Sequence, residues 1–380
     1  MDFQLSEEQR MVRQMMHNFA SKEIAPQSQA IDALDQFPVQ IFRRMADLGI
    51  LGLPFPEEYG GAGSDYISLV IALEEIARAS GSVAIILDAH TSLCCEPIYL
   101  FGTEEQKRKH LVPLVRGEKI GAFGLTEPQA GSDAGAIQTC AVRDGEAWVL
   151  HGQKIFITNG ALADVLVVAA KTDPSKGTKG ISTFIVEKGS AGFRAGRSEK
   201  KMGLHGSVTS ELFFDHCRIP LDNLLGKENE GFKQILTTLN AGRIAIAAMA
   251  VGLAQGALDK AAAYAKERVQ FGQPIAHFQA IQWMIADMAT DIEAARLLVY
   301  RAAWLKSNGR QCIKEASIAK LFATEASERV CRKAIQIHGG YGYIQEYDVE
   351  RMYRDQRLCS IGEGSNEIQR LIIARQELGI

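Results

Sequence analysis

The feature that most constrains the fold is a residue pattern that changes twice along the chain. Up to about Gly117 apolar residues recur at helical spacing, and the same spacing returns from about Glu228. Between them lie short runs rich in Val, Ile, Phe and Thr, separated by Gly, Asp and Pro, which is typical of a small antiparallel sandwich or barrel. The 380 residues also exceed what one core usually supports. We therefore predict an α+β multidomain chain with an N-terminal helical domain (1–117), a middle β domain (118–227) and a C-terminal helical bundle (228–380).

Two short patterns predict where individual helices begin. Ser6 followed by Gln9 fits a capping box, in which each residue's side chain satisfies the other's backbone N–H. Asn366 followed by Gln369 predicts a second helix start near the C-terminus. We expect the apolar residues of that last helix to form its buried face: Ile368, Leu371 and Ile372.

The charge balance and the apolar runs exclude several partners. Lys and Arg number 42 against 45 Asp and Glu, so the net charge of -3 gives no electrostatic case for nucleic acid or an anionic membrane. The longest strongly apolar run, Ile244 to Ala254, is too short to span a bilayer and predicts a buried helix, so no membrane insertion is expected. The N-terminus has neither an apolar signal region nor an Arg-rich transit pattern. We expect a cytoplasmic protein, or one in an organelle matrix if a leader has been removed.

Several common sites are missing from the spacing of residues. The seven cysteines form no CxxC pair and the eight histidines no HExxH pair, so neither a disulfide framework nor a metal site is expected. There is no GxxxxGK[ST], no GxSxG and no GxGxxG after a strand. A nucleotide cofactor would therefore not use a P-loop or a Rossmann crevice.

Four loops remain as candidates for chemistry. AFGLTEPQAGSD (122–133) has small residues whose backbone could approach a flat or phosphorylated ligand, with a plain surface turn as an equal alternative. RVQFGQP (268–274) has an arginine that could meet a phosphate or merely complement a helix C-terminus. QIHGGYGY (336–343) has two glycines that permit close approach or simply end a helix. Glu363 lies between Gly362 and Gly364 just ahead of a helix, where the helix dipole favours a carboxylate and where a ligand could also reach the acid.

Taken together, these stretches resemble the acyl-CoA dehydrogenase family, and most closely its short-chain, butyryl-type members. The resemblance covers nearly the whole chain through EEYGGAGSDY, FGTEEQK, AFGLTEPQAGSDA, KIFITNG, RVQFGQP, QIHGGYGY and IGEGSNEIQRLIIAR. It implies a helical domain, a β domain and a four-helix bundle, one FAD per subunit, and a homotetramer. It also implies that electron-transferring flavoprotein reoxidises the FAD.

The resemblance assigns roles to individual positions. Those that match the family's FAD positions are Phe123, Leu125, Thr126, Gly131, Ser132, Phe156, Ile157 and Thr158. Those that match its adenosine-diphosphate positions, across a subunit boundary, are Arg268, Phe271, Gln279, Gln336, Ile337, Gly339 and Gly340, followed by Ser365, Asn366 and Glu367. Those that match its acyl-CoA positions are Ser132, Asn240, Arg243, Gly362 and Gly364.

The family's catalytic base falls on Glu363. A positioned carboxylate can take the weakly acidic α-proton of an acyl thioester once its carbonyl is polarised. In this family a backbone N–H at the base and the flavin ribityl hydroxyl polarise it, and the β-hydrogen leaves as hydride to flavin N5. Exclusion of water should raise the pKa of Glu363 toward the operating pH.

Three residues depart from the family pattern. Gly362 replaces a larger residue that usually walls the acyl pocket, and Phe156 stands where many relatives have Trp, although butyryl-type members also carry Phe. Asp88 interrupts the apolar helix SVAIILDAH, which lines the acyl pocket in this family. Asp88 either pairs with His90 or faces a polar gap, or it acts as an additional acid or base on a cyclohexane- or cyclohexene-carboxyl-CoA. The default expectation is a short straight or branched acyl-CoA, and the rivals from another class are a flavin oxidase and a non-catalytic scaffold of the same fold.

Overall fold

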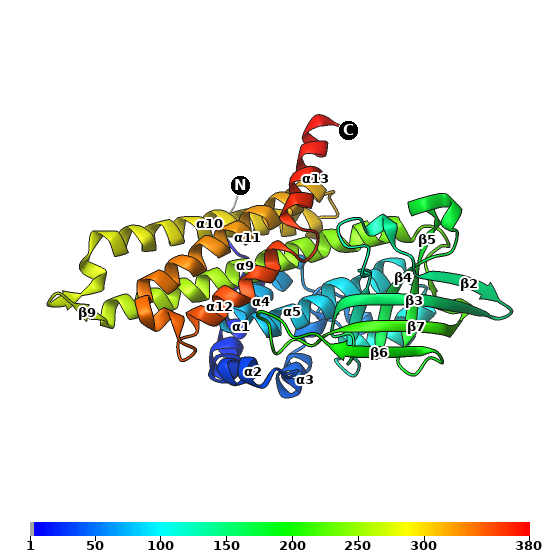
Figure 1. Ribbon diagram of the computed structural model, residues 1–380, viewed down its shortest axis with the longest axis horizontal. Helices are drawn as coiled ribbons and strands as arrows, with labels where there is room; N and C mark the ends of the chain where they lie inside the picture. Colours follow the sequence, from blue (N-terminus) through cyan, green and yellow to red (C-terminus); the bar gives the residue numbers. More distant parts are fainter. Residues whose placement is uncertain (1–3) are drawn as a thin grey trace.

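A computed structural model describes residues 4–380 as an elongated molecule with a helical body at one end and a β domain at the other (Figure 1). The N-terminal part begins with the predicted capping box, in which Ser6 and Gln9 exchange hydrogen bonds at the start of the first helix. Its α-helices are α1 (Glu7–Phe19), α2 (Ser28–Leu34), α3 (Val39–Asp47), α4 (Tyr66–Ala79), α5 (Gly81–Asp88), α6 (Glu96–Phe101), α7 (Glu104–Gln106) and α8 (Val112–Val115). Three π-helical segments continue these helices: η1 (Ala20–Ile24), η5 (Ala89–Cys95) and η6 (Lys107–Leu111).

The middle part is one eight-stranded sheet in the order β6-β7-β3-β2-β4-β5-β8, with β1 paired to β4. Its strands are β1 (Gly121–Gly124), β2 (Cys140–Asp144), β3 (Ala147–Thr158), β4 (Val165–Lys171), β5 (Ile181–Glu187), β6 (Phe193–Ser198), β7 (Thr209–Pro220) and β8 (Leu224–Leu225). Most neighbours are antiparallel, as predicted. The pairings of β4 with β1 and with β2 are parallel, which the sequence did not indicate, because strand direction depends on how the chain returns to the sheet.

The C-terminal part returns to helices. They are α9 (Gly231–Glu267), α10 (Gln279–Ser307), α11 (Ile313–His338), α12 (Val349–Gln356) and α13 (Asn366–Leu378). A small hairpin of β9 (Val269–Gln270) and β10 (Gln273–Pro274) joins α9 to α10 at the far end of the bundle. Short 3-10 turns η10 (Ile275–His277), η11 (Gly339–Tyr343) and η12 (Arg357–Ser360) complete this part.

The two helical parts share one hydrophobic core, although the β domain separates them in sequence. Buried side chains of α1, α4 and α5 lie in the same cluster as those of α9, α10 and α11. The β domain has its own core around Trp148, Phe184 and Phe214. The helical body is therefore a single rigid support for any site at its junction with the sheet.

Two helical stretches, Gly81–Phe101 and Gly231–Glu267, are long and apolar enough to cross a bilayer by length and composition. In the fold, 83% and 89% of their most apolar windows are buried inside the molecule, so they serve here as core helices. The run Ile244 to Ala254 is buried along its whole length within α9, as predicted.

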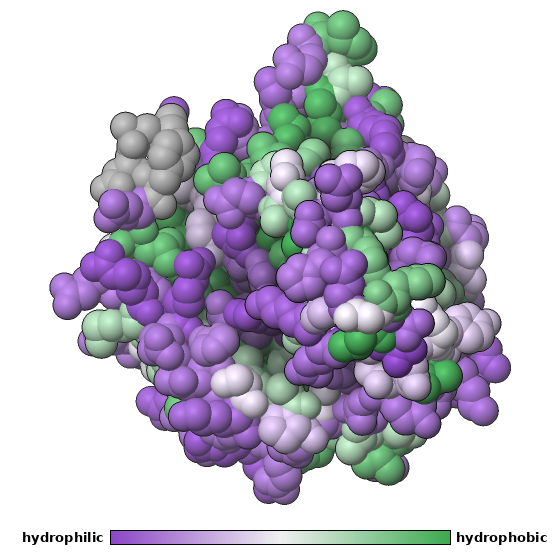
Figure 2. All heavy atoms as spheres, turned by 90° about the vertical axis from the view of Figure 1, so that its left-hand side faces the viewer, coloured by the Kyte–Doolittle hydropathy of each residue, from purple (hydrophilic) through white to green (hydrophobic). Residues whose placement is uncertain are grey.

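Helix α13 corrects one expectation. It begins at Asn366 as predicted, but it projects from the bundle, and its buried residues are Asn366 and Gln369 (Figure 1). Leu371 is 44% exposed, so the predicted apolar face is not buried within one chain. The Gln369 side chain donates to the carbonyls of Glu363 and Gly364 in the loop before the helix. Hydrophobic atoms gather at the tip where α13 projects (Figure 2).

The contact between α4 and α9 generates a stability prediction. An added Cβ at Gly252 would lie 2.2 Å from the Glu74 carbonyl oxygen, so the two helices would have to separate. Alanine is favoured over glycine in a helix by about 1 kcal/mol, but overpacking costs about 1–3 kcal/mol. We expect Gly252→Ala to lower the unfolding midpoint in urea. The control Ala263→Gly, at an exposed site of the same helix, measures the contribution of helix propensity to stability alone. A midpoint that rises in Gly252→Ala would contradict the close contact.

Candidate functional site

The loop that carries Glu363 has a strained backbone held by buried donors. Glu363 has φ +57° and Gly364 has φ +85°, in the left-handed region that L residues rarely adopt. Lys320 donates to the Gly364 carbonyl at 2.9 Å, and Gln369 donates to the carbonyls of Glu363 (3.1 Å) and Gly364 (2.8 Å). Arg243 Nε approaches the Glu363 carbonyl at 3.5 Å. These donors fix the direction in which the Glu363 side chain points.

The Glu363 carboxyl occupies an enclosed space beside helix α9. The residue as a whole is half-buried, but its Oε2 is enclosed and has no hydrogen-bond partner within residues 4–380. A Cβ at Gly242 of α9 would lie 2.4 Å from Oε2, so only glycine leaves room for the acid there. Burial raises the pKa of Glu363 to about 7, against the lowering effect of Arg243 and Lys320. Such a carboxyl is poised to take or give a proton near neutral pH.

Asp88 is a second buried acid beside the first. It ends α5 where the π-helical segment η5 begins, it is fully buried, and neither carboxyl oxygen has a hydrogen-bond partner in the described chain. Burial, and then the charge of Glu363, raise the pKa of Asp88 well above its ordinary value. The nearby Ser92 hydroxyl is also without a partner and can turn toward this carboxyl.

His90 does not pair with Asp88, so that alternative is wrong. Its Nδ1 accepts from the Gly121 N–H at 3.0 Å, and its Nε2 lies 3.0 Å from the Leu114 carbonyl oxygen, which it can donate to. Burial lowers the pKa of His90 to about 4, so the ring is neutral. His90 therefore joins the helical part to strand β1.

The loop Ala122–Asp133 is anchored by a buried ion pair that the sequence did not single out. Lys154 Nζ lies 2.7 Å from Glu127 Oε1 and donates to the Leu125 carbonyl at 3.0 Å. Glu127 also accepts from the backbone N–H of Gln138 and of Thr139. Burial lowers the pKa of Lys154 to about 8, but the pair remains charged at neutral pH. In the sequence, Glu127 lies within AFGLTEPQAGSDA and Lys154 within KIFITNG, but no local pattern indicates that the two side chains pair.

The predicted flavin positions lie at this same end. Phe123, Leu125 and Thr126 belong to β1 or follow it directly, and Ile155 donates to the Thr126 carbonyl at 2.9 Å. Gly131 has nothing within 4 Å of an added Cβ, so a ligand could approach it, and the next residue, Ser132, is exposed.

The end of β3 supplies an exposed aromatic face. Phe156 has φ +59° and is 61% exposed, whereas its neighbour Ile157 is buried and Thr158 half-buried. A phenylalanine held in a left-handed conformation with its ring in solvent is costly unless a ligand covers it. These features fit a flat cofactor lying against the end of the sheet.

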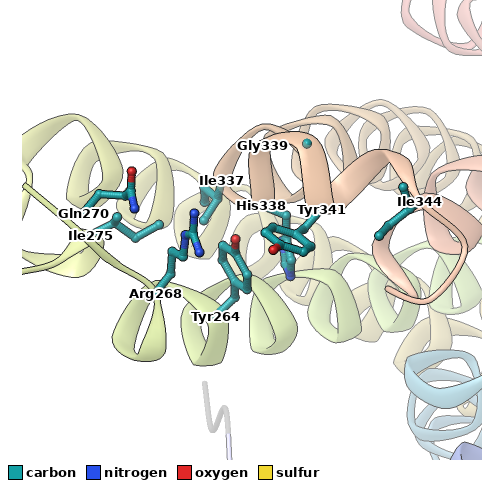
Figure 3. A pocket seen from close by; sticks show the side chains of 10 residues that line it. Tyr264, Arg268, Gln270, Ile275, Ile337, His338, Gly339, Tyr341 and Ile344 are labelled. Carbon is teal, nitrogen blue, oxygen red and sulfur yellow. The ribbon is translucent and has the colours of Figure 1, made fainter.

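The positions that the resemblance assigns to the adenosine diphosphate of FAD gather around a hollow of about 490 Å³ (Figure 3). This hollow lies at the C-terminal end of α9, far from Gly242. Arg268, Ile337, Gly339 and Gly340 line it, together with Tyr264, Gln270, Ile275, His338, Tyr341 and Ile344. Within residues 4–380 no carboxylate pairs with the Arg268 guanidinium, which lies 5.4 Å from the centre of the Tyr341 ring. A free guanidinium beside two glycines suits a phosphate.

The remaining predicted positions divide into two groups. Phe271 (93% exposed), Gln279 and Gln336 lie in solvent near this hollow but do not line it. Asn366 differs from expectation, because its side-chain oxygen accepts from Lys320 and Thr324 and so faces inward. Ser365 and Glu367 flank it at the helix start. Asn240 accepts from Arg243 at 2.8 Å, which places both at the loop of Glu363.

The predicted base and the predicted adenosine-diphosphate positions lie far apart within one chain. Gly242, beside Glu363, and Arg268, beside the hollow, lie on or at the end of the same helix α9. At 1.5 Å per residue they are about 39 Å apart. Within one chain, the hollow beside Arg268 therefore lies far from Glu363.

The comparisons with known proteins agree along the whole chain. The acyl-CoA dehydrogenase N-terminal, middle and C-terminal domain models match residues 6–118, 122–217 and 229–378. The chain is 51% identical to a short-chain specific acyl-CoA dehydrogenase of Clostridium acetobutylicum over 98% of this chain and 99% of that one. It is 49% identical to the Caffeyl-CoA reductase-Etf complex subunit CarC of Acetobacterium woodii over 97% and 98%. The structure of butyryl-CoA dehydrogenase from Megasphaera elsdenii superposes with a TM-score of 0.98 at 46% identity, covering all of both chains.

The role of the buried ion pair between Glu127 and Lys154, which anchors the loop Ala122–Asp133, can be tested by substitution. Breaking a buried ion pair by removing one partner costs about 3–5 kcal/mol, because a charge remains buried alone. We expect Lys154→Met to lose most of its bound flavin and to unfold at lower denaturant, and the double variant Glu127→Gln/Lys154→Met to recover part of both. The measurements are the ratio of flavin to protein absorbance and the unfolding midpoint. A yellow, fully stable Lys154→Met protein would mean that the pair does not hold the loop.

Proposed function

We propose, from the premise that this chain belongs to the acyl-CoA dehydrogenase family, that it removes two hydrogens from the α and β carbons of a short acyl-CoA. The family consists of oxidoreductases that act on acyl-CoA with FAD as acceptor, so the expected cofactor and reaction class are confirmed. The observation that carries the proposal to named residues is the enclosed, unpartnered Oε2 of Glu363, whose pKa burial raises to about 7.

The protein residues would act on the α-proton as follows. Glu363 takes the proton at its carboxyl, and the space left by Gly242 allows the acid and the thioester to meet. The Glu363 backbone N–H has no acceptor in the hydrogen bonds of residues 4–380, so it is available to polarise the thioester carbonyl. Arg243 and Lys320 hold the loop through its carbonyls and add positive charge near the developing carboxylic acid. FAD supplies the acceptor for the hydride that leaves the β carbon.

The proposed base generates a pH prediction. Since the pKa of Glu363 is raised to about 7 and the base must be ionised, kcat/KM should fall as the pH drops through about 7 and level off above it. Lys320 lowers this pKa, so Lys320→Met should move the acidic limb to higher pH. The matched control Lys314→Met, at the half-exposed start of the same helix where the lysine pairs with Glu377, should leave the limb in place. An unchanged limb in Lys320→Met would show that this charge does not set the pKa of the base.

We also propose a homotetramer with the FAD site completed by a neighbouring subunit. Support comes from the separation of about 39 Å along α9 between Gly242, beside Glu363, and Arg268, beside the hollow. The exposed apolar residues of α13 and α10, among them Leu371, Trp283 and Trp304, are available to cover one another between chains. Arg268, Gln279, Gln336, Gly339 and Gly340 would then hold the diphosphate part of a partner's cofactor.

Electron-transferring flavoprotein is the proposed acceptor, supported by a relative that is named as a subunit of an Etf complex. That relative is named as a reductase, so the direction of the reaction would follow the electron supply. A cytoplasmic location, or an organelle matrix if a leader was removed, stays a prediction.

A second candidate substrate class follows from Asp88. A buried carboxyl without partners is costly, and the π-helical segment that begins beside it is a feature that often occurs at functional sites. We propose that Asp88 serves as an additional acid or base if the acyl group is a cyclohexane or cyclohexene ring. The space beside Gly362 is smaller than its missing side chain suggests, because Ile246 Cδ1 lies 3.2 Å from where a Cβ would stand.

A panel of acyl-CoAs added to the anaerobic, FAD-loaded protein tests both proposed substrate classes, the short acyl-CoA and the cyclic acyl-CoA. We expect butyryl-CoA to bleach the flavin absorbance, with Glu363→Gln slowing bleaching by about 10²–10⁴-fold because the general base is lost. Bleaching by cyclohexane-carboxyl-CoA that weakens in Asp88→Asn, while bleaching by butyryl-CoA does not, would establish the second carboxyl as catalytic.

The other outcomes of the panel decide against the proposals. Bleaching by butyryl-CoA alone would return Asp88 to a structural role. No bleaching by any thioester would favour a scaffold, and rapid peroxide formation in air without another acceptor would favour an oxidase.

A further inference from the structure

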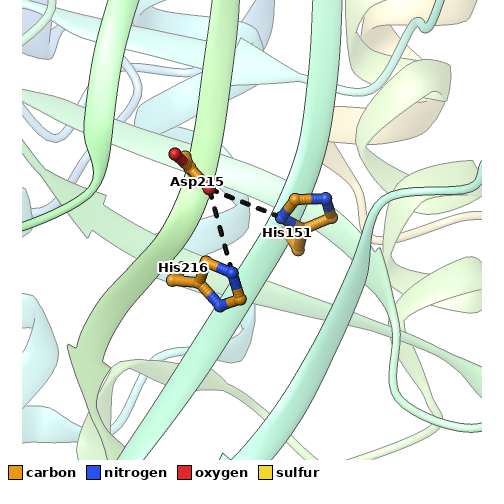
Figure 4. A group of neighbouring side chains, drawn as sticks. All are labelled: His151, Asp215 and His216. Atoms are coloured by element: carbon orange, nitrogen blue, oxygen red, sulfur yellow. Dashed lines mark ion pairs between the residues drawn. The ribbon is translucent and has the colours of Figure 1, made fainter.

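We propose that the outer face of the β domain carries a binding site for one divalent transition-metal ion, formed by His151 of β3 with Asp215 and His216 of β7 (Figure 4). The three side chains are exposed, and one ligand atom from each lies within 4.8 Å of the others. This site is separate from the reaction proposed above and depends on different residues.

A bulge between β3 and β7 builds the cluster. Leu150 pairs with Cys217 and Gly152 pairs with Phe214, so Asp215 and His216 together oppose the single residue His151. Consecutive side chains of a regular strand point to opposite faces, and the extra residue of a bulge changes this alternation. His216 has φ +50°, the left-handed conformation that turns its side chain back toward Asp215 and His151.

The distances suit a metal after small rotations. His151 Nδ1 and His216 Nε2 each lie 3.9 Å from Asp215 Oδ1. In a tetrahedral zinc site with bonds of about 2.0–2.1 Å, ligand atoms are about 3.3 Å apart. The two separations from Asp215 therefore need to shrink by about 0.6 Å, and the exposure of the side chains leaves the remaining coordination positions open to water.

The donor set selects the kind of ion. Two imidazoles and one carboxylate suit zinc, nickel or copper, whereas magnesium and calcium prefer oxygen ligands. The nearest cation on β7, Arg218, is engaged by Asp144 at 2.6 Å and so offers little repulsion to a bound ion.

A bound ion would cross-link strands β3 and β7. β3 runs on from His151 to Phe156, about 16 Å away at the rise of a strand. An ion at the bulge would tie β3 to β7 without reaching the flavin face, so it should stabilise the fold and leave turnover unchanged. Spacing in the sequence could not indicate the site, because its ligands come from strands that are distant in the chain.

The test uses the FAD-loaded protein after removal of metals with EDTA. Calorimetric titration with zinc chloride should show one ion bound per chain, and zinc should raise the unfolding temperature. His151→Ala and His216→Asn should each weaken binding by more than about tenfold, since loss of a second-shell partner alone costs about 10–100-fold. Asparagine is chosen at position 216 because it tolerates a positive φ.

Two matched variants exclude other sources of binding. His277→Ala removes an exposed histidine outside the cluster, and Cys140→Ser removes the free thiol that is not buried; both should bind zinc as the parent does. No saturable binding, or binding that survives in the His151→Ala/His216→Asn double variant, would overturn the proposal. Loss of binding in Cys140→Ser would also overturn it, because the thiol would then be the ligand.

Discussion

The candidate site depends on one constraint, a left-handed backbone at Glu363 and Gly364 that buried donors hold in place. A non-glycine residue in this region costs about 1–3 kcal/mol. A hydrogen bond that involves a charged group contributes about 1.5–3 kcal/mol, so the donation from Lys320 to the Gly364 carbonyl alone can offset the strain. The donors bind the backbone and leave the carboxyl oxygen Oε2 of Glu363 without a partner. The loop is thus stabilised through its carbonyls, while the acid keeps its full capacity to accept a proton.

Helix α9 joins this local constraint to the whole molecule. Its glycines allow two close approaches, of the Glu363 carboxyl at Gly242 and of the α4 backbone at Gly252. Its last turn leads to Arg268 and the hollow that Arg268 lines. Because one stiff helix carries both ends, the distance between Glu363 and the hollow beside Arg268 is fixed within a chain. This geometry is the physical reason to expect the cofactor between subunits.

The sequence predicted the order of the domains because helix and strand periodicity are local patterns, whereas the assignment of the base to Glu363 came from the family resemblance and stays a prediction. Periodicity separates helices from strands, and paired glycines mark a loop that must be approached closely. The pair of Glu127 with Lys154 and the inward turn of Asn366 could not be predicted, since each depends on a tertiary contact between distant residues. The exposed face of α13 was missed for a related reason, because the periodicity of an apolar face does not reveal whether the same chain or another covers it.

The two buried acids behave as a pair rather than as separate groups. Two carboxylates in a low-dielectric site cannot both ionise without strong repulsion. Glu363 has Arg243 and Lys320 near it, whereas Asp88 has only polar neighbours without charge to lower its pKa, such as Ser92. The proton is therefore retained on Asp88 while Glu363 ionises near neutral pH. A neutral Asp88 can donate a hydrogen bond, so it does not add a negative charge beside Glu363 and favours an acyl group that accepts that bond.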